Sequence, residues 1–448
     1  MPRAFVYLIY NSLLPFVLLL GFPSFLIKGI RRGGLKRNFC QRFGWFRPEI
    51  RDAIAGKEAI WIHAVSVGEV FLALKMVEAI QSLEPDQHIV LTTTTTTGHA
   101  VADEKTSETL TVIHNPVDLP RVVSRVLDLI QPKTIVLVES EIWPNLLAAA
   151  GKRGIPVKLA NARLSPRSGR RYAKFRSLVE PIFSQLDAVS VPFEIDRPRW
   201  SALGIPEGRI EVLGSVKFDQ AGGNEISDQK VAEIRAWLAL TGFPEGARIL
   251  LAGSTHDGEE KLIATVFSQL REKQPDLALV IVPRHAERAA EIVARLSAQG
   301  FTTLLKAGPN RVESLTQQGP VDTANHVWVA NTTGELRAWF HLASVVIIGK
   351  SFCGEGGQNP VEPILAGRPV VVGPNMQNFA EVMDDLNAVR GILQLKSPDE
   401  LFEALVKTFE DEAGSKAMAE RGTEAMARHL GAAERTARFI LGDSSGSV

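Results

Sequence analysis

The feature that most constrains the fold is an alternation of short apolar runs with helical stretches, which begins at Ile60. The runs are rich in β-branched residues, and this alternation is typical of a parallel sheet covered by helices on both faces. We expect two series of strands, at residues 60–65, 88–93, 134–138, 156–160 and 188–191, and at residues 248–252, 277–282, 326–330, 344–349 and 368–373. The polar stretch 220–229 separates them, and residues 398–441 are helical in composition. The sequence therefore predicts two open α/β domains, which bind ligands at the carboxyl ends of their strands.

Composition narrows the class of protein. The length of 448 residues favours more than one domain, and 45% hydrophobic with 22% charged residues is ordinary for a folded chain. Fifty basic residues balance fifty acidic ones, which argues against a globally basic nucleic-acid-binding protein. The two cysteines, Cys40 and Cys353, lie far apart in the sequence, so we expect neither a disulfide scaffold nor a cysteine-ligated zinc site.

The N-terminal segment has the composition of a membrane anchor. Residues 4–27 carry no charge, and as a helix they would extend about 36 Å, enough to cross a hydrocarbon core of roughly 30 Å. Asn11, Pro15 and Pro23 weaken a span, so a helix lying in the membrane interface is the alternative. The basic residues that follow predict a cytoplasmic location for the rest of the chain and attraction to an anionic membrane surface; they are Lys28, Arg31, Arg32, Lys36 and Arg37.

Common nucleotide and metal motifs are missing from the sequence. Gly349-Lys350-Ser351 resembles the end of a phosphate loop, but Ser344 stands where that motif requires glycine. Asn359 stands where a G-x-G-x-x-G motif would have its last glycine. No Asp-x-Asp pair occurs, so we expect no metal site and no cofactor.

The segment Ala64–Gly68 differs by one residue from the G-x-S-x-G nucleophile elbow, which makes a serine hydrolase acting through Ser66 an alternative function. Glu69 follows in the predicted first turn of a helix, where free amides and the helix dipole stabilise an ionised carboxylate. Such a group at a ligand-binding edge is suited to act as a general base. The alternative role for Glu69 is helix stabilisation alone.

Ten motifs, in their order along the chain, resemble those of the 3-deoxy-D-manno-octulosonic acid (Kdo) transferases of lipid A biosynthesis. They are HAVSVGE (63–69), TTTTTTG (92–98), PVDLP (116–120), VESEIWPN (138–145), NARLS (161–165), GSVKFD (214–219), AGSTHDGEE (252–260), VPRH (282–285), TTGEL (332–336) and GGQNPVEP (356–363). Lys350 and Gln358 depart from the family pattern, which usually has a small residue and a histidine at these positions.

The resemblance implies a GT-B glycosyltransferase with two Rossmann-like domains facing a central cleft. Residues 1–51 would form the anchor and basic segment, residues 52–219 the acceptor domain and residues 220–448 the donor domain, with the last helices as candidates to cross back. The implied reaction is metal-independent, inverting transfer of Kdo from CMP-Kdo to a lipid A precursor of the lipid IVA type. The implied location is the cytoplasmic face of the inner membrane.

The resemblance also implies catalytic residues. Glu69 matches the family's catalytic glutamate. Glu139 and Glu141 are expected to end a strand two residues apart, and hence on one face. One of these two and Lys217 would stabilise the transition state; the choice between the glutamates stays open, and an ion pair with a purely structural role is the alternative.

The second domain is expected to bind CMP. Arg284 follows a strand and could meet a phosphate, and the segment from Thr333 would begin a helix whose free amides offer an anion site. Asn359 and Glu362 could both face the ribose hydroxyls. The alternative role for this pair is helix capping. The candidate donor residues are Pro283, Arg284, Gly334, Glu335, Leu336, Asn359, Pro360, Val361 and Glu362.

Two further segments are candidates for substrate contacts. Ser254, Thr255 and His256 are expected to open a helix near the donor. A basic stretch suits the phosphates of the acceptor, or else forms a solvated helix face: Arg163, Arg167, Arg170, Arg171, Lys174 and Arg176. A nucleotide-binding membrane protein without catalytic activity is the third functional alternative.

Overall fold

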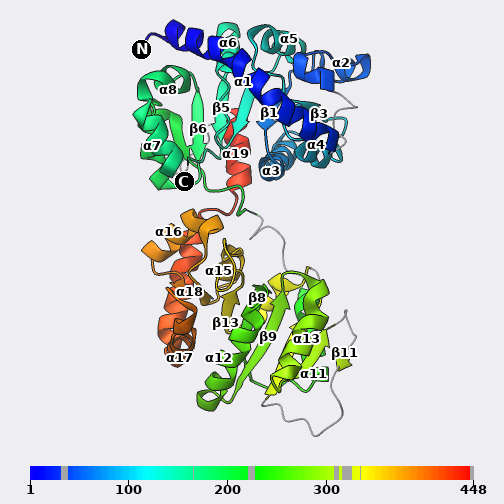
Figure 1. The fold of residues 1–448 in the computed structure, drawn as a ribbon, viewed down its shortest axis with the longest axis vertical. Coiled ribbons are helices and arrows are strands. Elements are labelled where there is room, and N and C mark those ends of the chain that lie inside the picture. The colour runs from blue at the N-terminus through cyan, green and yellow to red at the C-terminus, as the bar shows by residue number, and fades with distance from the viewer. Residues whose placement is uncertain are drawn as a thin grey trace. The chain divides into compact units, whose positions relative to one another are not determined.

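The computed structural model describes residues 1–31, 39–164, 166–219, 228–306, 312–314, 325–332 and 334–443. The chain divides into two compact units, Met1–Asp219 with Gly431–Val448, and Gln220–Leu430 (Figure 1). Four residues of the sequence argument, Arg32, Lys36, Arg37 and Thr333, lie outside the described residues, as does most of the predicted linker.

The first unit contains a parallel sheet of seven strands in the order β3-β2-β1-β4-β5-β6-β7. The strands are β1 (Ile60–Ala64), β2 (Ile89–Thr93), β3 (Leu110–His114), β4 (Thr134–Val138), β5 (Val157–Ala160), β6 (Ala188–Val191) and β7 (Ile210–Val212). The chain runs outward from β1 to β3 and then returns to place β4 on the other side of β1. Strand order therefore reverses between β1 and β4, where open α/β sheets bind ligands beyond the carboxyl ends of the strands.

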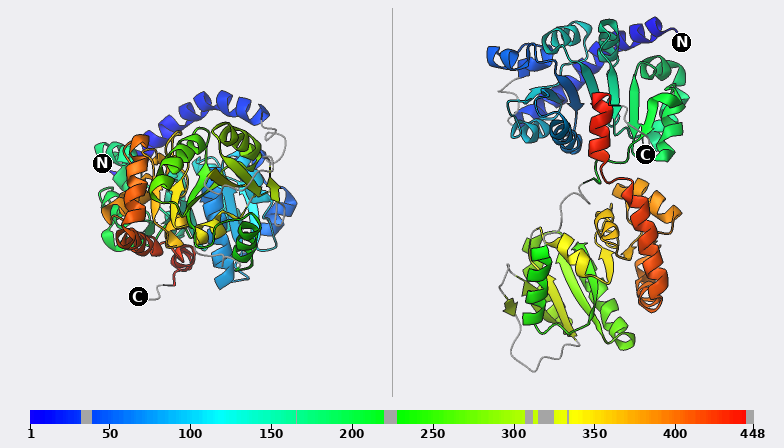
Figure 2. Two further views of the ribbon diagram at one scale, coloured as in Figure 1. Left: turned by 90° about the horizontal axis from the view of Figure 1, so that it is seen from below. Right: turned by 180° about the vertical axis from the view of Figure 1, so that it is seen from behind.

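The central strands of this sheet are fully buried, because helices cover both of its faces. They include α2 (Pro48–Ile54), α3 (Val67–Leu83), α4 (Thr96–Asp103), α5 (Pro120–Ile130), α6 (Pro144–Arg153), α7 (Pro166–Lys174), α8 (Arg176–Phe183) and α9 (Arg197–Ser201). The last helix, α19 (Ala432–Leu441), belongs to this unit and packs against α3 (Figure 2). The Asp219 carboxylate accepts a hydrogen bond from Ala433 N at 2.8 Å, which joins the two separate segments of the unit.

The N-terminal helix α1 (Arg3–Arg31) also belongs to the first unit. Among the described residues it is the single helix that is long and apolar enough to cross a membrane, over Arg3–Leu20, and only 6% of that window is buried. Burial in a soluble core therefore does not account for its apolar composition.

The second unit contains eight strands in the order β11-β10-β12-β9-β8-β13-β14-β15, and only the β10–β11 pair is antiparallel. The strands are β8 (Arg248–Thr255), β9 (Leu277–Pro283), β10 (Thr302–Lys306), β11 (Val312–Ser314), β12 (His326–Ala330), β13 (Val345–Ile348), β14 (Val370–Val372) and β15 (Leu393–Gln394). Strand order reverses between β8 and β13. At this point a side chain on Gly349 would lie 2.3 Å from the Ser254 carbonyl oxygen, so only glycine permits the close approach of the two strand ends.

The helices of the second unit include α11 (Asp228–Leu240), α12 (Glu259–Lys273), α13 (Ala289–Ala298), α14 (Leu336–Leu342), α15 (Val361–Leu365), α16 (Ala380–Ala388), α17 (Leu401–Glu410) and α18 (Glu412–Ala427). The prediction that residues 254–256 open a helix is wrong. Strand β8 continues to Thr255 through a register shift, with Ser254 in the left-handed region at φ 56°, and α12 begins only at Glu259.

Candidate active site

Glu69 is held at the carboxyl end of β1, where α3 begins. Ser66 is the N-cap of α3: its hydroxyl accepts from Glu69 N at 3.3 Å and donates to Glu69 Oε1 at 2.8 Å. Glu69 Oε2 accepts from Val65 N at 2.9 Å. The carboxylate therefore caps the helix and is also fixed at the point where strand order reverses, so the capping role and a catalytic role are compatible.

The same contacts weigh against a serine hydrolase, which requires a histidine to activate the serine. The Ser66 hydroxyl is engaged with Glu69. The nearby His63 is fully buried, with Nδ1 2.9 Å from the Thr92 hydroxyl, and burial lowers its pKa to about 3. An imidazole that resists protonation so strongly is poorly suited to accept a proton from serine.

The prediction that Glu139 and Glu141 end a strand is wrong, because β4 ends at Val138. Glu139 lies in the left-handed region with φ 60°, so the backbone turns and the alternation of faces no longer applies. Glu139 N donates to the Ala160 carbonyl at 3.0 Å, and Glu139 Oε1 lies 3.8 Å from Arg163 Nη1. Glu139 is therefore fixed against the end of β5.

Glu141 has an unusually high affinity for its proton. Burial raises the pKa of Glu141 to about 7, and the negative charges of Glu69 and Glu139 contribute to the same shift. The charges of two carboxylates, Glu69 and Glu139, thus act on the Glu141 carboxyl at the reversal point. A carboxyl whose pKa is raised by burial and by neighbouring negative charge is common at sites where enzymes transfer protons.

We expect this shift to appear in the pH dependence of stability. The folded-state pKa of Glu141 lies above the ordinary value of 4.5, so ionisation of Glu141 should reduce the free energy of unfolding as the pH rises from about 4.5 through 7. Glu141→Gln should remove this loss. At pH 8 its free energy of unfolding should exceed that of the wild type by about 1 to 2 kcal/mol, after discounting for solvent screening. Urea unfolding of both proteins at pH 5 and pH 8 measures the difference; identical pH dependence would contradict the assigned shift.

Lys217 lies at the same carboxyl edge, as an exposed residue of the turn that follows β7. Lys75 Nζ of α3 donates to the carbonyl oxygens of Val216 and Lys217 at 3.1 and 3.2 Å. Val216 N donates to Asn161 Oδ1 at 3.1 Å. These contacts fix the turn beside α3 and the end of β5, although β7 itself lies three strands away from β4 in the sheet.

The basic stretch of the first unit lies on α7 and the start of α8. Arg170, Arg171, Lys174 and Arg176 are exposed, and the side chain of Arg167 lies outside the described residues. Arg176 pairs with Glu180 at 2.9 Å, whereas Arg163 lies beside Glu139. That this basic stretch binds the phosphates of the acceptor stays a prediction.

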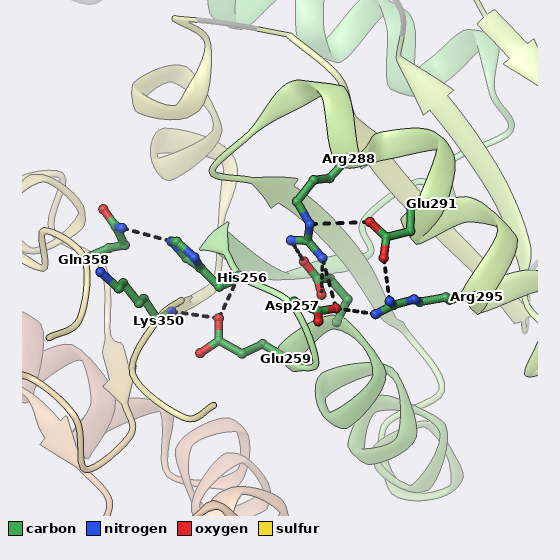
Figure 3. Close-up of polar contacts among 9 residues, drawn as sticks. His256, Asp257, Glu259, Arg288, Glu291, Arg295, Lys350 and Gln358 are labelled. Carbon is green, nitrogen blue, oxygen red and sulfur yellow. Dashed lines mark hydrogen bonds and ion pairs between the residues drawn. The ribbon is translucent and has the colours of Figure 1, made fainter. Parts of the chain in front are cut away.

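In the second unit, a buried carboxylate joins the two loops at the reversal point. Glu259 is fully buried, and its Oε2 accepts from His256 N at 2.9 Å and from Lys350 N at 2.7 Å (Figure 3). Glu259 Oε1 accepts from Phe352 N at 3.0 Å. One carboxylate thus connects the loop after β8 to the loop after β13. Sequence reasoning missed this role, although Glu259 lies within the motif AGSTHDGEE.

The two departures from the family pattern lie beside this carboxylate. Lys350 has φ 57° and is fixed by its backbone contact to Glu259. Gln358 Nε2 lies 3.1 Å from His256 Nε2 (Figure 3), and burial lowers the pKa of His256. An amide donor from Gln358 is compatible with the neutral histidine that burial favours.

The candidate donor residues lie at or beyond the carboxyl ends of β9, β12 and β13, at one edge of the sheet. Pro283 is the buried end of β9, and the Arg284 side chain is exposed beyond it. Glu335 is the N-cap of α14, so this helix begins at Leu336 and not at Thr333. The Glu335 carboxylate accepts from Lys306 Nζ at 2.9 Å and from the Thr332 hydroxyl at 2.5 Å, both of which hold it in place.

Asn359 and Glu362 share a face, as predicted. Asn359 Nδ2 donates to Glu362 Oε1 at 3.2 Å, and Asn359 Oδ1 accepts from Val361 N at 3.0 Å. Glu362 Oε2 also lies 3.3 Å from Arg337 Nε. Pro360 is the N-cap of α15, and the Asn359 side chain binds the first backbone N–H of this helix, while Glu362 connects Asn359 to Arg337.

Within the part of the chain that the structure describes, no group of three or more His, Cys, Asp or Glu side chains is placed to hold a metal ion.

Comparison with known proteins assigns this architecture to a family. The family described as 3-deoxy-D-manno-octulosonic-acid transferase (kdotransferase) matches residues 37–220. A 3-deoxy-D-manno-octulosonic acid transferase of Bordetella pertussis is 31% identical over 91% of this chain and 92% of its own length. The Haemophilus influenzae transferase of the same name is 29% identical over 89% of this chain and 90% of its own. The crystal structure of a Rickettsia africae glycosyltransferase, 11% identical, covers 86% of this chain and 99% of that chain with a TM-score of 0.51.

The two Rossmann-like units, with the last helix returned to the first unit, define a GT-B glycosyltransferase. Within this class, the chain belongs to the 3-deoxy-D-manno-octulosonic acid transferase family. The sequence-based family assignment and fold class are confirmed.

Proposed function

We propose that the protein transfers Kdo from CMP-Kdo to a phosphorylated lipid A precursor of the lipid IVA type, with inversion and without a metal ion, at the cytoplasmic face of the inner membrane. The observation that carries the proposal is the position of Glu69, a buried carboxylate fixed by Ser66 and Val65 at the reversal point of the first sheet. Family membership supplies the sugar that is transferred.

Glu69 acts as the general base in this proposal. It accepts the proton of the acceptor hydroxyl while that oxygen attacks the anomeric carbon of Kdo and the bond to the CMP phosphate breaks. A single direct displacement inverts the configuration at this carbon, and one base is sufficient for it. Glu141, with a pKa of about 7, can remain neutral beside anionic substrates, and Lys217 supplies positive charge at the same edge.

The second unit binds the donor in this proposal. Arg284 meets the phosphate, and Asn359 with Glu362 meets the ribose hydroxyls. Glu335, held by Lys306, positions the start of α14 beside the nucleotide. The loops joined by Glu259 form the floor of the site.

The decisive experiment is to incubate the purified full chain with CMP-Kdo and a bisphosphorylated lipid A precursor and to measure the product by mass spectrometry. We expect the acceptor mass to increase by one or more Kdo residues, with release of CMP. CMP binding without a product would favour a nucleotide-binding membrane protein. Hydrolysis that is lost in Ser66→Ala but kept in Glu69→Gln would favour the serine hydrolase.

We expect transfer to proceed at an unchanged rate in the presence of EDTA, because protein side chains and helix termini neutralise the donor phosphate in this proposal. The rate should be compared before and after chelation, and again after excess Mg²⁺ is added. A rate that EDTA abolishes and Mg²⁺ restores would contradict metal independence.

A further inference from the structure

The first three turns of α1 are attached to the first unit by buried polar groups. Asp118 is 2% exposed and Asn145 is 4% exposed. Tyr10 Oη donates to Asp118 Oδ2 at 2.9 Å, and the Asn11 and Asn145 side-chain amides exchange hydrogen bonds at 3.1 and 2.8 Å. Tyr7 Oη also donates to the Pro144 carbonyl at 2.8 Å. These polar contacts would be lost if this part of α1 entered lipid.

Asp118 binds other groups of the first unit as well as the helix α1. Its carboxylate also accepts from the backbone N–H groups of Asn145 and Leu146, both at 2.9 Å, and thereby caps the start of α6. Tyr10 and Asn11 therefore bind a cluster that is already fixed in place. Burial raises the pKa of Asp118 to about 6, and the Tyr10 hydroxyl offsets part of this effect.

The chain returns to the same unit after the apolar segment. Gln41 and Arg42 lie in the 3-10 helix η1 (Phe39–Phe43), and both are buried. Gln41 Oε1 accepts from His114 N at 2.9 Å, and Arg42 Nη2 donates to the Thr94 carbonyl at 2.7 Å. The chain is thus bound to the first unit on both sides of residues 12–40.

This double attachment leaves too little chain to cross a bilayer and return. Residues 12–27, the uncharged part beyond Asn11, reach about 24 Å as a helix, less than the roughly 30 Å of a hydrocarbon core. Residues 28–40 would then have to recross lipid while carrying five basic side chains, which hydrocarbon strongly disfavours.

The other side of α1 has the character of a lipid-binding surface. Its exposed apolar residues include Leu13, Phe16, Val17 and Leu20, which follow one face of a helix and are 57%, 65%, 63% and 80% exposed. Closer to the N-terminus, Phe5 and Leu8 are 48% and 63% exposed. The helix runs along the outside of the first unit in Figures 1 and 2.

We propose that α1 lies in the plane of one membrane leaflet, with Tyr7, Tyr10 and Asn11 bound to the first unit and its apolar face in lipid. The N-terminus then stays on the same side of the membrane as the two sheet-containing units. The partner is a bilayer that contains anionic lipid, since five basic residues follow the apolar run. This inference rests on the proposed membrane location, but its test requires no catalytic activity.

The test compares the sidedness of two thiols in the full chain. Cys353, an exposed cysteine of the second unit, reports the side of the catalytic units, and Pro2→Cys in a Cys40→Ser background reports the N-terminus. Inverted and right-side-out membrane vesicles are treated with a membrane-impermeant maleimide, and the labelled peptides are identified by mass spectrometry. We expect both thiols to react in the same vesicle preparation. Reaction of the two thiols in opposite preparations would overturn the proposal.

A second measurement tests the attachment directly. Asn11→Cys with Asn145→Cys should be joined by a short bismaleimide while the protein remains membrane-bound, because the two wild-type side chains are in contact. Leu20→Cys with Asn145→Cys is the control pair, since Leu20 is 80% exposed, and should not be joined. A membrane-bound protein in which the first pair reacts no better than the control would show that α1 leaves the unit in the bilayer, and the proposal would fail.

Discussion

Glu69→Gln should lower the rate of Kdo transfer by about 10² to 10⁴, the usual contribution of a positioned general base. The amide has the size of the carboxylate but cannot accept the proton of the acceptor hydroxyl. It can preserve the local structure: its oxygen can accept from Val65 N, and its NH₂ group can donate to the Ser66 hydroxyl, which can rotate to accept. We therefore expect normal folding and normal CMP affinity together with the loss of rate.

The matched control is Glu78→Gln, which makes the same change on an exposed position of α3. Its rate should equal that of the wild type. Initial rates with saturating CMP-Kdo and CMP binding by calorimetry measure the two quantities. A Glu69→Gln enzyme that keeps more than a tenth of the wild-type rate would assign the proton transfer to another group.

The sequence predicts the alternating architecture well, because strands that are buried on both faces read as continuous apolar runs. It misses β3, β7, β10, β11 and β15. All five lie at or next to a sheet edge, and β7, β11 and β15 span only two or three residues. In β3, Thr111 and His114 leave only Val112 and Ile113 as consecutive apolar residues, which is too weak a signal to stand out from its surroundings.

The site is predictable only as far as local patterns determine geometry. Glu69 is found correctly at the start of α3 because Ser66 and Glu69 form a capping box, which is a local signal. The positions of Glu139 and Ser254 are not predictable in this way, because both adopt a positive φ in which a non-glycine residue is held by contacts with other segments. Glu259 is missed because its three partners come from loops that lie up to 93 residues away in the sequence.

Glu259→Ala should destabilise the second unit by about 3 to 5 kcal/mol, since three backbone N–H groups would lose their acceptor, and each unsatisfied buried group costs about 1 to 3 kcal/mol. Because Glu259 is fully buried, water does not readily replace the carboxylate. Glu259→Gln keeps the volume but turns an NH₂ group toward at least one of these donors, so we expect an intermediate loss. Chemical unfolding monitored by tryptophan fluorescence measures the series.

The same substitutions should weaken CMP binding, because Glu259 joins the loop that carries His256 to the loop that carries Lys350 and Phe352. When these loops are no longer connected, the ligand must supply the free energy that orders them, so we expect at least a tenfold rise in Kd in Glu259→Ala. Glu272→Ala, an exposed change on the same helix, is the control and should alter neither quantity. If Glu259→Ala loses stability but keeps its affinity for CMP, the donor does not contact these loops, and its site must lie nearer to β12 and α14.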